Sequence, residues 1–102
     1  MSKSFHQRTI EIIKRIPKGK VATYGQIAAY AGSNRAARQV AYILHSSSRK
    51  ENLPWHRVIN SKGCISLKPK HGYEIQKKQL KKERIIFKEN DCIDLERYLW
   101  LP

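Results

Sequence analysis

The residues best suited to chemistry in this chain lie in one short stretch, Pro54-Trp55-His56-Arg57-Val58. A cysteine thiolate beside the histidine would be a soft, strong nucleophile that could accept an alkyl group. The residue at that position is Trp55, and an indole does not react in this way in water near neutral pH. Trp55 instead offers a broad apolar surface for contact with a ring or an alkyl group. The stretch itself therefore contains no strong nucleophile, and we predict no catalytic residue in it.

The two cysteines, Cys64 and Cys92, stand outside this stretch. They form no metal-ligand pattern, and we predict neither a metal site nor a cofactor. We interpret them as free thiols in a reducing cytoplasm. Cys64 follows Trp55 by nine residues, on an expected strand over 64–66. We therefore do not expect Cys64 to act as a nucleophile.

The charge balance points to a polyanionic partner. The chain of 102 residues carries 21 Lys and Arg against 8 Asp and Glu, a formal net charge of +13. Such a charge attracts nucleic acid first and anionic membrane second, and no apolar run approaches the ~20 residues of a membrane span. We predict one small domain over 1–102 that binds nucleic acid, not membrane. We expect it in the cytoplasm, on the nucleoid if the source is a bacterium.

Helices must position the Trp55 stretch. Ser4-Phe5-His6-Gln7 and Thr23-Tyr24-Gly25-Gln26 both have the form of a capping box. Apolar spacing predicts helices over 5–16 and 24–31.

A third helix is predicted over 35–46, with Ser33 or Asn34 as its cap and Gly32 ending the helix before it. Two helices joined by a short turn that contains glycine are typical of a helix-turn-helix, although ordinary helical hairpins share the pattern.

The third helix has two faces. Spacing by three and four residues predicts a core-facing side made of Ala37, Val40, Ala41 and Leu44. The opposite side carries Arg35, Arg38, Tyr42, His45 and Arg49. Such a basic and aromatic side suits contact with phosphates and bases, or it is simply a solvated charged face.

The rest of the chain adds short elements around these helices. We expect a polar loop over 46–52 and a charged helix over 74–84, in which Ile75 and Leu80 give weak apolar periodicity. The apolar tail over 92–102 should dock on the domain. The predicted fold class is mainly α with short strands.

Several of these segments together resemble the O6-alkylguanine-DNA alkyltransferases. Pro54 through Val58 resembles their active-site signature Pro-Cys-His-Arg-Val, with Trp55 in place of the reactive cysteine. Segments 19–28 and 36–40 resemble the start of their DNA-binding region and their recognition helix. The ending Tyr98-Leu99-Trp100-Leu101-Pro102 resembles that of the alkyltransferase-like proteins. The resemblance spans about residues 5–88 and implies a winged helix-turn-helix-like domain of the alkyltransferase C-terminal type.

The resemblance also implies roles for single residues on DNA. Arg38 matches the arginine that enters the duplex and fills the space of an extruded base, which a planar guanidinium can do by stacking and donating hydrogen bonds. Tyr24 matches the tyrosine that crowds the phosphate beside the target nucleotide. Arg35 and Ala36 lie beside Arg38 on the same helix, and the small Ala36 would let a groove wall come close. In this family the recognition helix lies in the minor groove, which is degenerate in sequence and suits a damage scanner.

Around the pocket, the resemblance implies a histidine–glutamate relay made by His56 and Glu83. Without a thiol to activate, His56 should hold the turn, and Arg57 should anchor it and lie in the DNA-binding set. Lys68 matches a basic residue at the pocket rim. The expected lesion pocket therefore comprises Tyr24, Trp55, His56 and Lys68.

The resulting hypothesis is a non-enzymatic, monomeric sensor of O6-alkylguanine in double-stranded DNA. It would flip the lesion against Trp55 and flag it for nucleotide excision repair proteins. Two alternatives stay open: a sequence-specific helix-turn-helix transcription regulator, and an active transferase that uses a non-standard residue.

Overall fold

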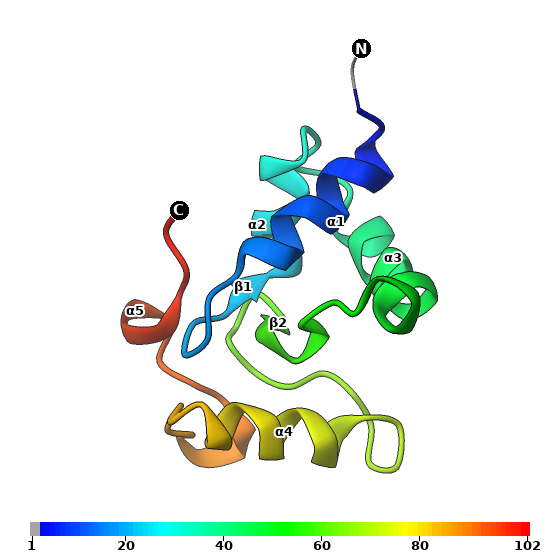
Figure 1. Ribbon diagram of the computed structural model, residues 1–102. Coiled ribbons are helices and arrows are strands. Elements are labelled where there is room, and N and C mark those ends of the chain that lie inside the picture. The colour runs from blue at the N-terminus through cyan, green and yellow to red at the C-terminus, as the bar shows by residue number, and fades with distance from the viewer. Residues whose placement is uncertain (1–2) are drawn as a thin grey trace.

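The computed structural model describes residues 3–102 and has the predicted mainly helical architecture with two short strands (Figure 1). The elements follow in the order α1 (Phe5–Arg15), β1 (Ala22–Thr23), α2 (Tyr24–Tyr30), α3 (Ala37–Glu51), the 3-10 turn η1 (Trp55–Arg57), β2 (Val58–Ile59), α4 (Tyr73–Lys82), the 3-10 turn η2 (Glu89–Asp91) and α5 (Leu95–Tyr98). Helices α1, α2 and α3 pack together, and α4 lies below them in Figure 1.

Both predicted capping boxes are formed. The Ser4 hydroxyl accepts a hydrogen bond from the Gln7 backbone N–H at 3.1 Å, and the Gln7 side chain accepts one from the Ser4 N–H. Thr23 and Gln26 make the same reciprocal pair. These bonds satisfy backbone N–H groups that a helix start leaves without partners. They fix where α1 and α2 begin, and therefore where Tyr24 lies.

A two-stranded parallel sheet brings the Trp55 stretch to the start of α2. Ala22 pairs with Val58 and Thr23 with Ile59. Because η1 leads directly into β2 and β1 leads directly into α2, this register places the turn Trp55–Arg57 beside Tyr24.

The core has two parts. One lies between α1, α2 and α3 and contains Ile13, Ile27 and Val40, all fully buried. The other lies under α4 and the C-terminal segment and contains Leu80, Ile93 and other apolar residues. Within residues 3–102, no helix combines the length and apolarity that crossing a bilayer requires.

The tail docks as predicted. The Val21 N–H donates to the Tyr98 carbonyl at 2.9 Å, and the Trp100 N–H donates to the Val21 carbonyl at 2.7 Å. Tyr98 and Trp100 are buried, while Leu101 is exposed.

Helix α3 is displaced and longer than predicted. It begins at Ala37, so neither Ser33 nor Asn34 is its cap. The Ser33 N–H instead donates to the Ala28 carbonyl and helps to close the end of α2, where Gly32 has the predicted left-handed backbone. The helix runs on to Glu51 through a segment that we predicted as a loop, because Ser47 in that segment is buried against the core.

The buried face of α3 is also shifted from the prediction. Ala36, Val40, Ile43, Leu44 and Ser47 are buried, whereas Ala41 is exposed and Ala37 is only partly buried. The predicted outward residues on the other side are all exposed.

The prediction of two free thiols is wrong, because Cys64 and Cys92 form a disulfide. The two residues face each other across an isolated antiparallel bridge. Residues far apart in the sequence meet there because the Ile93 N–H donates to the Gly63 carbonyl and the Ile65 N–H to the Asp91 carbonyl. The disulfide removes the argument from free thiols to a reducing compartment.

We expect Cys64→Ser to lower the free energy of unfolding by about 3.6 kcal/mol, the loop-closure value for cysteines 28 residues apart. Urea unfolding with and without reductant measures this difference. The variant Cys64→Ser/Cys92→Ser should lose no more than the single variant, because both remove the same bond. Equal stability of the reduced and oxidised wild-type protein would contradict the disulfide.

Candidate nucleic-acid interface

The outer face of α3 is the clearest candidate surface for DNA. Arg38 on α3 and Arg35 in the turn before it are exposed, so Arg35 does not lie on the helix as predicted. No hydrogen bond or ion pair within residues 3–102 engages the Arg38 guanidinium. Tyr42 is 75 % exposed, which is unusual for so large an aromatic side chain. Ala36 is buried, so this residue can offer only its backbone to a ligand.

A pocket of about 420 Å³ opens next to this face. Helix α3 supplies one wall, η1 supplies Trp55, and the loop before α4 supplies the opposite wall. The lining residues are Tyr24, Ala41, Leu44, His45, Ser48, Trp55, Leu67, His71, Gly72 and Gln76. Because His45 belongs both to the outer side of α3 and to the pocket lining, the two surfaces are continuous.

Gly72 allows the loop wall to approach Trp55. Its φ is +108°, and a Cβ on it would lie 2.9 Å from Leu67 Cδ1 and 3.8 Å from Trp55 Cη2. A larger residue there would be strained and would enter the pocket.

Tyr24 lines the same pocket from the first turn of α2. Burial raises the pKa of its hydroxyl above the ordinary value of 10.0, and a hydrogen bond with Ser66 offsets part of that rise. Tyr24 is therefore a neutral phenol at physiological pH, held by the loop that follows β2.

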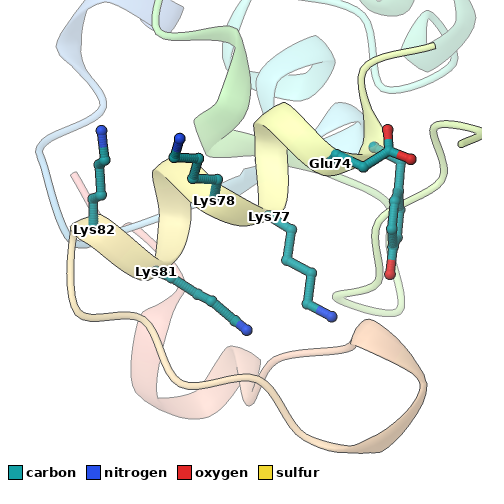
Figure 2. Close-up of a pocket in the computed structure, with 6 residues that line it drawn as sticks. Glu74, Lys77, Lys78, Lys81 and Lys82 are labelled. Carbon is teal, nitrogen blue, oxygen red and sulfur yellow. The ribbon is translucent and has the colours of Figure 1, made fainter. Parts of the chain in front are cut away.

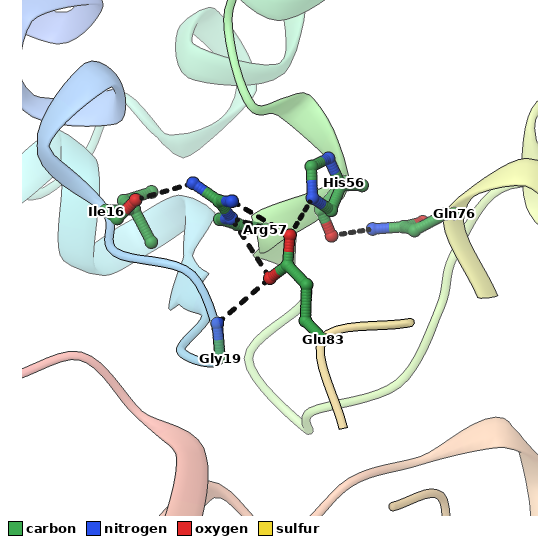
Figure 3. A network of polar contacts seen from close by, with 6 residues as sticks. All are labelled: Ile16, Gly19, His56, Arg57, Gln76 and Glu83. Atoms are coloured by element: carbon green, nitrogen blue, oxygen red, sulfur yellow. Dashed lines mark hydrogen bonds and ion pairs between the residues drawn. The ribbon is translucent and has the colours of Figure 1, made fainter. Parts of the chain in front are cut away.

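The turn that carries Trp55 is held by a buried carboxylate, Glu83 (Figure 3). Its Oε2 lies 2.7 Å from His56 Nε2 and 2.8 Å from Arg57 Nη2, and its Oε1 accepts from the Gly19 N–H at 3.0 Å. Since a carboxylate only accepts hydrogen bonds, His56 Nε2 carries the proton. Arg57 also donates to the Ile16 carbonyl at 2.9 Å. The network thus connects the turn to Ile16 at the end of α1, to Gly19 in the loop between α1 and β1, and to Glu83 at the end of α4.

Burial alone would raise the pKa of the Glu83 carboxyl. Hydrogen bonds from Arg57, the Gly19 N–H and His56 outweigh burial and lower that pKa from 4.5 to about 2. The side chain of Glu83 is 8 % exposed, so the charged form depends on these partners.

The expected lesion-pocket residues are thus divided between two places. Tyr24 and Trp55 line the pocket, whereas His56 points to Glu83 and Lys68 is exposed outside the lining. Arg57 faces inward in the ion pair with Glu83, in agreement with the predicted anchoring of the turn.

The charged helix α4 has a separate, wide groove of about 590 Å³ on its outer side (Figure 2). Lysines dominate it: Lys77, Lys78, Lys81 and Lys82, with Tyr73 and Glu74. Lys77 forms an ion pair with Asp91 at 2.6 Å. The groove is open and shares no lining residue with the pocket beside Trp55.

Sequence reasoning missed Gln76. Periodicity favoured Ile75 as an inward residue of α4, but Ile75 is 54 % exposed and Gln76 is 3 % exposed. Gln76 and Leu80 are four residues apart and share the buried side of α4. The i, i+4 spacing could have found this side, if a glutamine had been admitted as a buried residue.

We expect Glu83→Gln to lower the free energy of unfolding at pH 7 by about 3 kcal/mol, because it leaves Arg57 buried without its counter-charge. In the wild-type protein this contribution is complete above the unfolded pKa of 4.5 and is lost as the pH falls toward about 2. Denaturant midpoints measured from pH 7 down to pH 2 test this.

The variant should show a flatter profile across that pH window. Glu96→Gln, at an exposed position of α5, is the matched control and should keep the wild-type profile. If the denaturant midpoint of Glu83→Gln still falls steeply as the pH is lowered, another group causes the acid sensitivity.

Comparison with known proteins agrees with this geometry. Residues 4–85 match the family model described as "6-O-methylguanine DNA methyltransferase, DNA binding domain". The chain is 44% identical to the "DNA base-flipping protein" of Escherichia coli over 95% of this chain and 74% of that protein. It is 36% identical to "Alkyltransferase-like protein 1" of Schizosaccharomyces pombe over 96% and 95% of the two chains.

Solved structures give the same result. The S. pombe Atl1 structure, described as a complex "with damaged DNA containing O6-carboxymethylguanine", superposes with a TM-score of 0.87 at 35% identity over all of both chains. The Mycobacterium tuberculosis O6-methylguanine methyltransferase gives 0.62 at 26% identity, over 94% of this chain and 55% of that one. The chain therefore belongs to the family of the 6-O-methylguanine DNA methyltransferase DNA-binding domain and is an alkyltransferase-like member of it.

Proposed function

We propose that this protein recognises O6-alkylguanine in double-stranded DNA by base flipping and does not repair it. The observation that carries the proposal is the continuity of the exposed arginine face of α3 with a pocket lined by Trp55, the residue that the resemblance aligns with the family's nucleophile. The names of these relatives, a base-flipping protein and an alkyltransferase-like protein, support the same function.

In the proposed complex, α3 lies along the minor groove and Arg38 occupies the space of the extruded base. Its guanidinium is free to stack and to donate hydrogen bonds to the orphaned partner base. Tyr24 crowds the neighbouring phosphate at the pocket mouth. Arg35 and the backbone at Ala36 contact the DNA strands beside it.

The flipped base then lies against Trp55. The indole gives it an apolar wall and ring contact, but no atom that accepts the alkyl group near neutral pH. The carboxylate of Glu83 keeps His56 and Arg57 in place behind the turn, so these two residues act on the lesion only through the turn. Lys68 is exposed and follows Leu67, which lines the pocket, and in the proposed complex its amine stands at the pocket rim.

The biological consequence that we propose is a long-lived complex that flags the lesion for nucleotide excision repair proteins. The whole chain, 1–102, would act as one monomeric domain on DNA, in the cytoplasm or on the nucleoid. The charge of +13 supplies affinity for any DNA at low salt, so selectivity must come from the pocket.

The first test is a titration of two duplexes of one sequence, with O6-methylguanine or guanine at one position, at the same fixed salt concentration. Intact mass spectrometry of the lesion sample follows. We expect tighter binding to the lesion and no gain of a methyl mass on the protein. A gain of one methyl group would mean an active transferase, and equal binding to both duplexes would leave a DNA-binding domain whose sequence preference must be sought.

We expect Arg38→Ala to weaken binding to the lesion duplex by roughly 1–3 kcal/mol, because the space of the flipped base is left unfilled. The same titration measures it. Arg97→Ala, an exposed arginine on α5 at the other side of the molecule from α3 in Figure 1, is the matched control for loss of one positive charge. If both variants lose the same affinity, Arg38 acts only as a general cation.

A further inference from the structure

Gln76 holds the turn and faces the pocket at the same time. Its Nε2 donates to the His56 carbonyl at 3.1 Å and to the Val58 carbonyl at 2.9 Å. The residue comes from the inner side of α4, is 3 % exposed and lines the pocket beside Trp55. A polar side chain buried to this degree normally has all its hydrogen-bonding groups occupied.

The two carbonyls fix the direction of the amide. The opposite orientation would place Oε1 against two backbone oxygens, and none of those atoms could donate a hydrogen bond. Figure 3 shows the amide nitrogen directed at the His56 carbonyl. Oε1 must therefore point away from the turn.

Oε1 has no partner in the protein. No hydrogen bond to it occurs within residues 3–102, and Thr9 Oγ1 is the one fully enclosed side-chain polar atom without a partner there. Oε1 is therefore not sealed in the core. Since the surface that Gln76 contributes belongs to the pocket lining, this acceptor is open to whatever occupies the pocket.

The chemistry of the lesion limits which donor can meet it. Alkylation at O6 removes the proton from N1 of guanine, so the 2-amino group is the one hydrogen-bond donor left on the purine ring system. A bound base without a donor would displace water from Oε1 and give it no hydrogen bond in return, which disfavours binding.

We propose that Gln76 Oε1 accepts a hydrogen bond from the 2-amino group of the flipped base, and that Gln76 thereby selects 2-aminopurine lesions. This inference rests on the proposed function, since it needs the lesion in the pocket. The residue would bind the base directly through its oxygen while its nitrogen holds the Trp55 turn. The pocket would thus recognise that a lesion derives from guanine, whatever alkyl group is attached at O6.

The test compares two lesions in one duplex sequence at fixed salt, O6-methylguanine and O6-methylhypoxanthine. The second base is the same methoxypurine without the 2-amino group. We expect the ratio of affinities, O6-methylguanine over O6-methylhypoxanthine, to be about fivefold larger for the wild-type protein than for a variant without the acceptor, the net value of one hydrogen bond. Loss of the 2-amino group also weakens base pairing in the duplex and so makes flipping easier. This effect is the same for every protein variant. The ratio of the two affinities is therefore compared between the wild-type protein and the variants, as in a double-mutant cycle.

Two variants separate the two roles of Gln76. Gln76→Lys keeps a donor for the His56 and Val58 carbonyls but has no acceptor, and Gln76→Met removes both. We expect both to lose the preference between the two lesions. Gln79→Met, a half-buried glutamine one turn away that lies outside the pocket lining, should keep the wild-type ratio.

The outcomes are distinct from failure of the proposed function. If the wild-type protein prefers O6-methylguanine over guanine but its ratio between the two methoxypurines is no larger than that of Gln76→Met, the role of Gln76 is overturned and lesion recognition stands. A wild-type ratio that Gln76→Lys and Gln76→Met both retain overturns it as well. Equal binding to O6-methylguanine and guanine would overturn the proposed function itself.

Discussion

The arrangement of the pocket depends on one buried carboxylate. Glu83 accepts from Arg57, His56 and the Gly19 N–H, and it therefore joins three segments that are far apart in the sequence. A carboxylate is stable in such a place only when its partners compensate for lost hydration, and the pKa of about 2 reflects that compensation. The Trp55 turn is a 3-10 helix of three residues, which is too short to hold its own position. Its position comes from this network and from the pairing of β1 with β2.

The same network has a different consequence with tryptophan than it would have with cysteine. A histidine bound to a glutamate can draw a proton from a neighbouring thiol, and the resulting thiolate attacks an alkyl group. With Trp55 present, the proton on His56 serves only to bind Glu83. A site that carries no reaction needs no complementarity to a transition state, so all of its binding energy can stabilise the lesion as it is. On the proposed function, Trp55 in place of a nucleophile would leave a recognition site on the supporting structure of a repair site.

The sequence predicted best what is decided locally. The capping boxes at Ser4 and Thr23 were confirmed because each involves residues three apart. The end of α3, the Cys64–Cys92 disulfide and the burial of Gln76 were missed because each depends on a partner distant in the chain. Gln76 is the clearest case, since its burial is compensated by carbonyls of a turn about twenty residues earlier. The family resemblance located Glu83, Tyr24 and Trp55, which spacing alone could not bring together.

Discrimination has to arise in the pocket because the other contacts do not depend on base identity. A net charge of +13 attracts every duplex, and the minor groove presents a degenerate pattern of donors and acceptors. Weak pairing of a damaged base lowers the cost of flipping, but it does so for mismatches as well as for alkylated guanine. Only groups that touch the flipped base, from side chains or backbone, can tell these apart. In the proposed complex Trp55 would give ring contact that any base could use, so the polar groups of the lining would have to supply the remaining selectivity. Among them Gln76 is the one held in a single orientation by two backbone carbonyls, and a fixed acceptor discriminates better than one that can rotate to suit its ligand.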